Sequence, residues 1–547
     1  MVVRKYILCG VPGLLVLFAL SCAGKEDPGR PDQAGRNRNP VRCDEIVVFA
    51  DGEPEEGFDP LLGWGSYGCP YFQSTLLQRG PDMKLAGDLA EAWSLSEDRL
   101  VWRVRIRRDA RFSDGGPVTA RDVAFTFNRA ALACGKTDVT VLKEALATGP
   151  YEVELHLKKP QITFINRLAT LGIVPEHAYG SGYSRNPVGS GPYRLVRWDE
   201  GRQMIMEANP FYYGPKPGIR RVVFLYLKED TGFAAAKAGK VHVARVPQIL
   251  ARQKIPGMRM MSRPSVDNRG ICFPVLPADA ARTADGYPVG NDVTSRLSIR
   301  KAINYALDRR ALVKGVLEGF GSEAHGPVSR LPWDEPESAV RDGDPEEARR
   351  ILAEDGWRDS DGDGIVEREG VEARMTLFYP ADDALRQALA LAVADQVRPI
   401  GVEILVTARA WDDIYRLMYA HPVLFGFGSV DQTEMHNLYH GSRPGDRTHN
   451  PGFYKNETVD RYLELAMASP SEEEAIGFWR KAQWDGRTGF SARGDAAWAW
   501  LVNIDHTYFV DERLDQGHPR MEQHGSYITA NLPEWRWKEG TCFASLP

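Results

Sequence analysis

Strands with a period of two alternate with amphipathic helices through most of this chain, and that alternation limits the folds it can adopt. In residues 102–107, apolar and basic side chains alternate strictly, which predicts a strand with one buried and one wet face. Residues 151–157 repeat the pattern, and residues 222–227 are more continuously apolar, as in a central strand. Because helices separate these strands, the sequence predicts the α/β class.

Helix boundaries are also marked in the sequence. Thr119 is a suitable N-cap, and Asp122 stands at the capping-box position three residues later. Asp344 precedes a proline at the first helical position, which predicts another helix start. Apolar residues at helical spacing in 299–307 and an amphipathic stretch over 383–397 predict two more helices.

Length and composition restrict the class of protein. The chain has 547 residues, too many for one ordinary domain, so we expect two or more lobes. A hydrophobic fraction of 43% and a charged fraction of 26% are typical of a soluble globular protein. The formal net charge of -6 gives no basic footprint, and we therefore expect no nucleic-acid partner.

The N-terminus has the layout of an export signal. Arg4 and Lys5 precede an apolar run over residues 6–20, too short for a spanning helix. The small residue before Cys22 resembles the bacterial lipoprotein cleavage motif, in which that cysteine is lipidated; the alternative is a plain secretory signal. Residues 23–43 are rich in proline, glycine and charge, which predicts a flexible linker. We expect an extracytoplasmic protein held at the membrane by its lipid, in the periplasm or on the outer surface.

The cysteines suggest no metal site of their own. Without Cys9 in the signal and Cys22 at the anchor, five remain: Cys43, Cys69, Cys134, Cys272 and Cys542. An oxidising compartment permits disulfides, but the odd number and irregular spacing leave the pairing open. No Cys-x-x-Cys pair is present, which argues against a thiolate zinc site.

Several segments together point to one family. In chain order they are 89–93 (LAEAW), 111–115 (RFSDG), 118–123 (VTARDV), 174–177 (VPEH), 186–193 (NPVGSGPY), 209–213 (NPFYY) and 300–308 (RKAINYALD). Over about residues 45–535 the chain resembles bacterial extracellular solute-binding protein family 5, which serves peptide and nickel importers.

The resemblance implies a fold and a function. The fold is the bilobed periplasmic-binding-protein type II fold, with a hinge and an extra N-terminal subdomain. Lobe I would comprise residues 44–270 with 505–547, its subdomain about 70–185, and lobe II residues 271–504. The function is that of the substrate-binding component of an ABC importer, which captures a peptide or peptide-like solute and delivers it to membrane permease subunits. A nickel or metallophore-chelate ligand is the alternative. The family is non-enzymatic, and we expect a monomer without a cofactor.

Asp431 is the first candidate ligand contact. It stands in 427–432 (FGSVDQ), where relatives have an aromatic-glycine stretch followed by Asp-Pro. The resemblance implies that its carboxylate pairs with the free amine of a peptide, by a charge-assisted hydrogen bond. Gln432 replaces the usual proline, and the alternative for Asp431 is that it caps a turn.

A histidine pair follows. His436 and His440 are spaced i, i+4, which places both imidazoles on one helical face, with Tyr439 beside them and His449 downstream. Nickel relatives use histidine around this region, so we consider a metal or metal-chelate contact. The alternative is that these histidines are packed or face solvent.

The remaining ligand candidates are Arg269, Trp411, Trp498 and Trp500. Arg269 lies where the chain should cross between lobes, and it would pair either with a ligand carboxylate or across the lobes. The tryptophans are candidate cleft walls. The alternate spacing of Trp498 and Trp500 predicts a strand with both indoles on one face, which is either cleft or core.

The sequence favours neither a calcium site nor a hydrolase. Residues 359–364 (DSDGDG) open like a calcium loop, but Gly370 stands where an EF-hand needs glutamate, which favours a solvated acidic turn. A secreted hydrolase would need a nucleophile or metal motif, and neither G-x-S-x-G nor H-E-x-x-H occurs. We therefore do not expect an enzyme.

Overall fold

A computed structural model describes residues 43–49, 52–66, 70–133, 137–445, 448–525 and 528–542. The predicted signal, Cys22 as the predicted lipidation site and the predicted linker up to residue 42 lie outside these ranges, as do Cys69 and Cys134. In the part of the chain that is described, no helix has both the length and the apolar character to cross a membrane.

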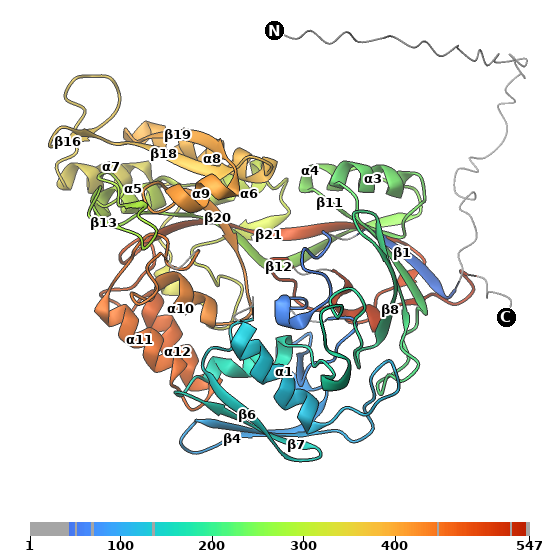
Figure 1. The fold of residues 1–547 in the computed structure, drawn as a ribbon. Coiled ribbons are helices and arrows are strands. Elements are labelled where there is room, and N and C mark those ends of the chain that lie inside the picture. Colours follow the sequence, from blue (N-terminus) through green and yellow to red (C-terminus); the bar gives the residue numbers. More distant parts are fainter. Residues whose placement is uncertain are drawn as a thin grey trace, which may run out of the picture. The chain divides into compact units, whose positions relative to one another are not determined.

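One mixed sheet of eleven strands organises the described part of the chain (Figure 1). Both parallel and antiparallel neighbours occur in it, as in an α/β protein. Its order is β19 (Glu403–Arg409), β18 (Arg374–Pro380), β20 (Val423–Phe427), β12 (Met258–Cys272), β21 (Trp498–Asp511), β11 (Val243–Val246), β1 (Glu45–Phe49), β10 (Arg221–Leu225), β9 (Gln203–Ala208) and β8 (Tyr193–Asp199), with β15 (Gly321–Glu323) beside β21.

The two longest strands, β12 and β21, join the halves of this sheet. They pair antiparallel from Met258 to Cys272, with register shifts between Pro264 and Asn268 and again between Arg269 and Gly270. The predicted lobe crossings, at 270/271 and 504/505, both fall within these strands. The lobe boundaries themselves stay a prediction.

A separate four-stranded sheet lies within the predicted N-terminal subdomain. Its order is β4 (Ala90–Leu95), β5 (Val101–Ile106), β7 (Glu152–Leu157) and β6 (Leu142–Gly149). Burial alternates along β5 and β7, which confirms both alternating strands predicted from the sequence. Helix α1 (Ala120–Ala133) begins as predicted, because the Thr119 backbone N–H donates to an Asp122 carboxylate oxygen at 2.9 Å.

Helices of the second half begin where the caps predict. Asp344 accepts the backbone N–H of Glu347 at 3.0 Å and opens α7 (Pro345–Glu354), and α8 spans Ala384–Val397. The segment around 299–307 forms two helices, α5 (Leu297–Ala306) and α6 (Arg309–Gly315). Asp308 separates them, since its side chain caps α6 by accepting the Ala311 N–H at 2.8 Å.

The subdomain shares an apolar core with helices from late in the chain. Its buried side chains form one cluster with those of α9 (Trp411–Leu417), α10 (Thr433–Tyr439), α11 (Glu457–Met467) and α12 (Glu472–Gln483). Figure 1 shows α10, α11 and α12 beside the strands and helix α1 of the subdomain. The short helix α2 (Ile165–Thr170) faces this group.

One disulfide ties the two ends of the described chain together. Cys43 and Cys542 are bonded across 499 residues, a pairing that the sequence left open. Cys272 is a buried free cysteine on β12, and burial raises the pKa of its thiol well above the usual value.

Candidate functional site

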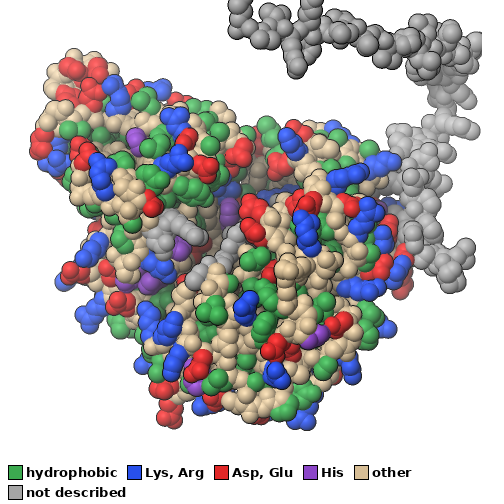
Figure 2. Space-filling view, in the orientation of Figure 1, with side chains coloured by type: hydrophobic (Ala, Val, Ile, Leu, Met, Phe, Trp, Pro, Cys, Tyr) green, Lys and Arg blue, Asp and Glu red, His purple; other side chains and the backbone are tan. Residues whose placement is uncertain are grey.

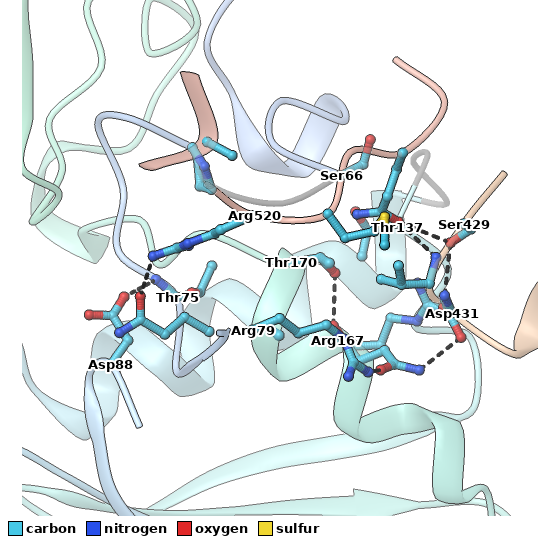
Figure 3. Close-up of a pocket in the computed structure, with 18 of the residues that line it drawn as sticks. Ser66, Thr75, Arg79, Asp88, Thr137, Arg167, Thr170, Ser429, Asp431 and Arg520 are labelled. Atoms are coloured by element: carbon cyan, nitrogen blue, oxygen red, sulfur yellow. Dashed lines mark hydrogen bonds and ion pairs between the residues drawn. The ribbon is translucent and has the colours of Figure 1, made fainter. Parts of the chain in front are cut away.

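A cavity of about 1100 Å³ lies among segments that are far apart in the sequence. Residues from 66–88, 130–140, 166–170, 192–218, 427–449 and 518–536 line it. Figure 3 shows two polar groups in its wall, one around Asp88 and Arg520 and the other around Arg167 and Asp431. Side chains of both charges therefore face the same space.

Of the predicted ligand contacts, Asp431 lines this cavity. Its carboxylate forms an ion pair with Arg167 of α2 and accepts the Asn166 amide N–H at 2.9 Å. It also accepts the backbone N–H of Thr433 at 3.0 Å, so the turn-capping alternative is realised as well. The role of Asp431 toward a ligand amine stays a prediction, and its oxygens already have protein partners.

Glu434 is a cavity residue that the sequence reasoning missed. Burial raises the pKa of Glu434 to about 8, against opposing hydrogen bonds from the backbone N–H groups of Gly428 and Ser429. At neutral pH this carboxyl is therefore mostly uncharged. Its position three residues after Asp431, in the first turn of α10, was the one available sequence signal.

Arginines of the cavity were also missed. Arg79 ends strand β2 (Leu77–Arg79), donates to the Met83 carbonyl oxygen at 2.8 Å and is bonded to Asn166. Burial lowers the pKa of Arg79, although Glu472 and Asp431 oppose the shift. No local pattern distinguishes such an arginine from the many on the surface.

His436 and His440 lie on one face of α10, as their spacing predicted. Their rings stack with centroids 4.4 Å apart. Burial lowers the pKa of His436 to about 3, with His440 adding to the shift. His440 contacts the Ser442 hydroxyl at 2.7 Å, and neither imidazole is in the cavity lining, whereas His449 is. Their metal role stays a prediction.

Tyr439, Trp498 and Trp500 are core residues. The Trp500 indole N–H donates to the Tyr439 hydroxyl at 2.8 Å, and the two indoles stack with centroids 4.9 Å apart. All three are buried and outside the cavity lining. The predicted strand with both indoles on one face is thus present, and that face belongs to the core.

Arg269 and Trp411 likewise lie away from the cavity lining. The Arg269 guanidinium donates to Asp267 at 2.5 Å, so its ion pair is formed within β12. Trp411 opens α9 and stacks on Phe425, with ring centroids 6.1 Å apart. For both residues a ligand contact stays a prediction.

A buried polar cluster stands at the register shift of β12 and β21. His506 bridges two carboxylates, Glu522 at 2.7 Å and Asp267 at 3.3 Å. His524 contacts Asp267 at 2.7 Å. Although burial favours the neutral acid, Arg269 and His524 hold the pKa of Asp267 well below its usual value. The cluster therefore ties both long strands to the C-terminal segment.

The acidic loop has the features of a solvated turn. Asp359, Asp361 and Asp363 bring carboxylate oxygens within 4.8 Å of one another, and all three are exposed. Figure 2 shows acidic side chains gathered at the tip of the molecule near β16 (Glu367–Arg368). Asp359 accepts the backbone N–H of Gly362 at 2.7 Å, so its oxygen already serves the turn.

Comparison with known proteins gives the family. The model of "Bacterial extracellular solute-binding proteins, family 5 Middle" matches residues 84–443. The chain belongs to this family. The family 5 protein is 31% identical over 492 residues to Protein XP55 of Streptomyces lividans, which covers 86% of each chain. It is 25% identical over 504 residues to the oligopeptide-binding protein AppA of Bacillus subtilis, covering 85% of this chain and 88% of AppA.

Solved structures confirm the fold of this family 5 protein. NikZ from Campylobacter jejuni, in complex with Ni(L-His), aligns with a TM-score of 0.76 at 23% identity, over 91% of this chain and 100% of NikZ. Bacillus subtilis AppA, in complex with a nonapeptide, aligns with a TM-score of 0.71 at 23% identity, over 92% of this chain and 100% of AppA. The predicted bilobed periplasmic-binding-protein type II fold is thus confirmed.

Proposed function

We propose that this family 5 protein is the substrate-binding component of an ABC importer and that its ligand is a peptide or peptide-like solute. The cavity carries this proposal. Its volume of about 1100 Å³ is slightly above the ~300–1000 Å³ typical of small-molecule sites. Backbone amides of a peptide need donors and acceptors along their length, and charged and polar side chains of the lining supply both.

The two alignments to AppA support the peptide class, since that relative is named for oligopeptide binding. We propose that the ligand comes from outside the cytoplasm and passes to permease subunits in the membrane. The protein would work as a monomer, attached to the membrane through lipidated Cys22.

Closure is proposed to occur about β12 and β21, between a lobe of residues 44–270 with 505–547 and a lobe of 271–504. Contacts such as Thr433 Oγ1 to Thr163 Oγ1, 2.9 Å, join the α10 segment to the subdomain. A ligand that contacts both sides would favour the arrangement in which these segments meet, and this differential contact shifts the population.

A nickel or metallophore chelate is the second candidate. His449 is in the cavity lining, and NikZ, which aligns with a TM-score of 0.76, was solved with Ni(L-His). His449→Ala, His436→Ala and His440→Ala, titrated with Ni(L-His)₂ by calorimetry, test it. Unchanged affinity in all three variants would exclude ligation by these three histidines.

The peptide proposal is tested by native mass spectrometry of protein purified from its host and by thermal unfolding with an oligopeptide library. We expect a co-purified peptide and a raised Tm, together with a smaller radius of gyration on binding. No Tm shift and unchanged scattering across peptides and nickel chelates would refute the proposal. The same peptides, analysed for cleavage after incubation, test the hydrolase alternative.

A further inference from the structure

We infer that the cavity takes an anionic ligand, whose carboxylate lies against Arg79 and Arg167, and that it does not require a free ammonium group on the ligand. This inference deepens the proposed function and rests on it, since it names the charge class of the peptide-like solute. It depends on which cavity charges already have partners within the protein.

The charged carboxylates of the cavity already have hydrogen-bond and ion-pair partners within the protein. Asp431 holds Arg167, the Asn166 amide and the Thr433 backbone N–H. An ionised carboxylate offers about four acceptor positions, so little of Asp431 is left for a ligand ammonium. Figure 3 shows the Asp431 carboxylate turned toward Arg167.

The Asp138 carboxylate also has partners within the protein. It accepts the backbone N–H of Thr140 at 2.9 Å and the Thr140 hydroxyl at 2.6 Å. Arg443 lies 3.5 Å from its second oxygen. Local hydrogen bonds and an arginine therefore neutralise this carboxylate too.

The remaining acidic residues of the described cavity lining are Asp88, Glu534 and Glu434. Asp88 accepts the Tyr213 hydroxyl and, at 3.2 Å, the Thr75 backbone N–H. Glu534 accepts the His518 backbone N–H at 2.8 Å. One Glu434 oxygen has no partner among the described residues, yet burial raises the pKa of Glu434 to about 8 and so keeps the group uncharged near neutral pH.

Positive charge is in local excess around Arg79 and Arg167. The side chains of Arg79 and Arg167 are 16% and 12% exposed, and both bond to the same small group, Asn166 with Asp431. Glu472 approaches Arg79 only to 3.9 Å. Of these two half-buried guanidiniums, only Arg167 thus has a closely bound carboxylate.

The interactions of the Arg79 and Arg167 guanidinium groups within the protein are also incomplete. The Arg167 Nε–H has no acceptor among the described residues, and burial lowers the pKa of Arg79 because its partners do not fully offset the lost hydration. A ligand carboxylate would supply the missing acceptor and charge. Guanidinium groups match a carboxylate in geometry as well as in sign.

Positive charge is in excess over the cavity lining as well. Among the described lining residues, the cationic side chains outnumber the carboxyl groups of Asp88, Asp138, Asp431, Glu434 and Glu534; they are Arg79, Arg167, Lys216, Arg443, Arg520 and Arg536. Since the Glu434 carboxyl is mostly neutral at physiological pH, the described lining side chains carry a net positive charge and favour an anion.

Four forms of tetra-alanine test the inference by calorimetry: the free peptide, the N-acetyl form, the C-terminal amide and the form blocked at both ends. We expect the N-acetyl form to bind at least as tightly as the free peptide. Blocking the carboxylate should weaken binding about 10- to 100-fold, as the loss of a charge-assisted hydrogen bond does. A free peptide that binds at least about tenfold tighter than its N-acetyl form would overturn the inference, with Asp431→Asn and Glu434→Gln showing which carboxyl holds the amine.

Variants locate the subsite. Arg79→Met should remove the preference for the free carboxylate, while Lys143→Met, the same charge change at an exposed residue outside the cavity lining, should leave it within about threefold. Arg167→Met should, in addition, release Asp431 and create a preference for the free amine. Arg79→Lys and Arg167→Lys keep the charge and serve if a methionine variant does not fold. An unchanged preference in the folded variants of both arginines would overturn the assignment.

If none of the four peptide forms binds, the peptide proposal fails, and small acids then test the anion subsite alone. Succinate should raise the Tm of the wild type and succinamide should not, because a ligand that binds the folded state stabilises it by mass action. The effect should be lost in Arg79→Met. Equal shifts by succinate and succinamide would contradict the inference even then.

Discussion

The Arg167–Asp431 ion pair joins α2 to the start of α10 across 264 positions of sequence, and its strength can be measured. The two side chains are 12% and 15% exposed, so solvent screens them only partly. Removing one partner of a fully buried pair costs about 3–5 kcal/mol and of an exposed pair about 0–1 kcal/mol. This pair lies between those limits, and we expect Arg167→Met and Asp431→Asn each to lower the free energy of unfolding by about 2–3 kcal/mol.

The double variant separates the interaction energy of Arg167 with Asp431 from the other contacts of each residue. Once Arg167 is gone, Asp431 keeps the Asn166 and Thr433 donors but carries an uncompensated charge. Replacing that charge as well should cost little more, so the double variant should lose about 2–3 kcal/mol rather than the sum, a coupling of about 2 kcal/mol.

Urea unfolding of the four proteins at low salt measures this cycle. A matched control is Arg350→Met on α7, where the guanidinium contacts Glu347 at 2.5 Å and is 55% exposed. That variant should unfold like the wild type, because an exposed pair is hydrated and screened. Additivity of the Arg167 and Asp431 variants within about 0.5 kcal/mol would refute the proposed coupling of α2 to α10.

Three further predictions follow from other parts of the fold. Although burial alone would lower the pKa of His506, hydrogen bonds to Asp267 and Glu522 raise it, so the stabilisation from protonated His506 is complete below about pH 6.5 and is lost as the pH rises through the folded-state pKa. The stability advantage of the wild type over His506→Gln should therefore shrink from pH 6 to 9. A difference in unfolding free energy that stays constant over this range would contradict the prediction. The double substitution Cys43→Ser and Cys542→Ser should lower the free energy of unfolding by about 2–5 kcal/mol, measured against wild type under reducing and oxidising conditions; an equal Tm in all cases would exclude a stabilising disulfide. Gly428→Ala should destabilise by at least about 1–3 kcal/mol in thermal unfolding, since the residue has φ +138 and an added Cβ would stand 2.2 Å from a carbonyl oxygen of β12; a Tm equal to wild type would show that the loop relaxes freely.

Local features of the sequence predicted the secondary structure well. The alternating residues of β5 and β7, the Thr119 capping box and the Asp344 cap act within a few positions of the chain, so their patterns are visible without knowing the fold. The break at Asp308 is equally local, because the Asp308 side chain caps α6, but it was not predicted. The order of short motifs then gave the family, and with it the bilobed fold.

The site depended on tertiary contacts. Hydrophobic periodicity showed that Trp498 and Trp500 share a face, but what covers that face is set by Tyr439, some sixty positions away, and it proved to be core. Arg79 carries no distinguishing local pattern, and Glu434 is marked only by its spacing from Asp431.

The sequence by itself thus determined the elements, their caps, the α/β class and the family. Only the tertiary structure decided that Asp431 is held by Arg167, that Cys43 pairs with Cys542, and which charges share the cavity. The physical reason is that burial and charge compensation depend on the distance in space between groups, and here that distance is set by segments hundreds of residues apart in the chain.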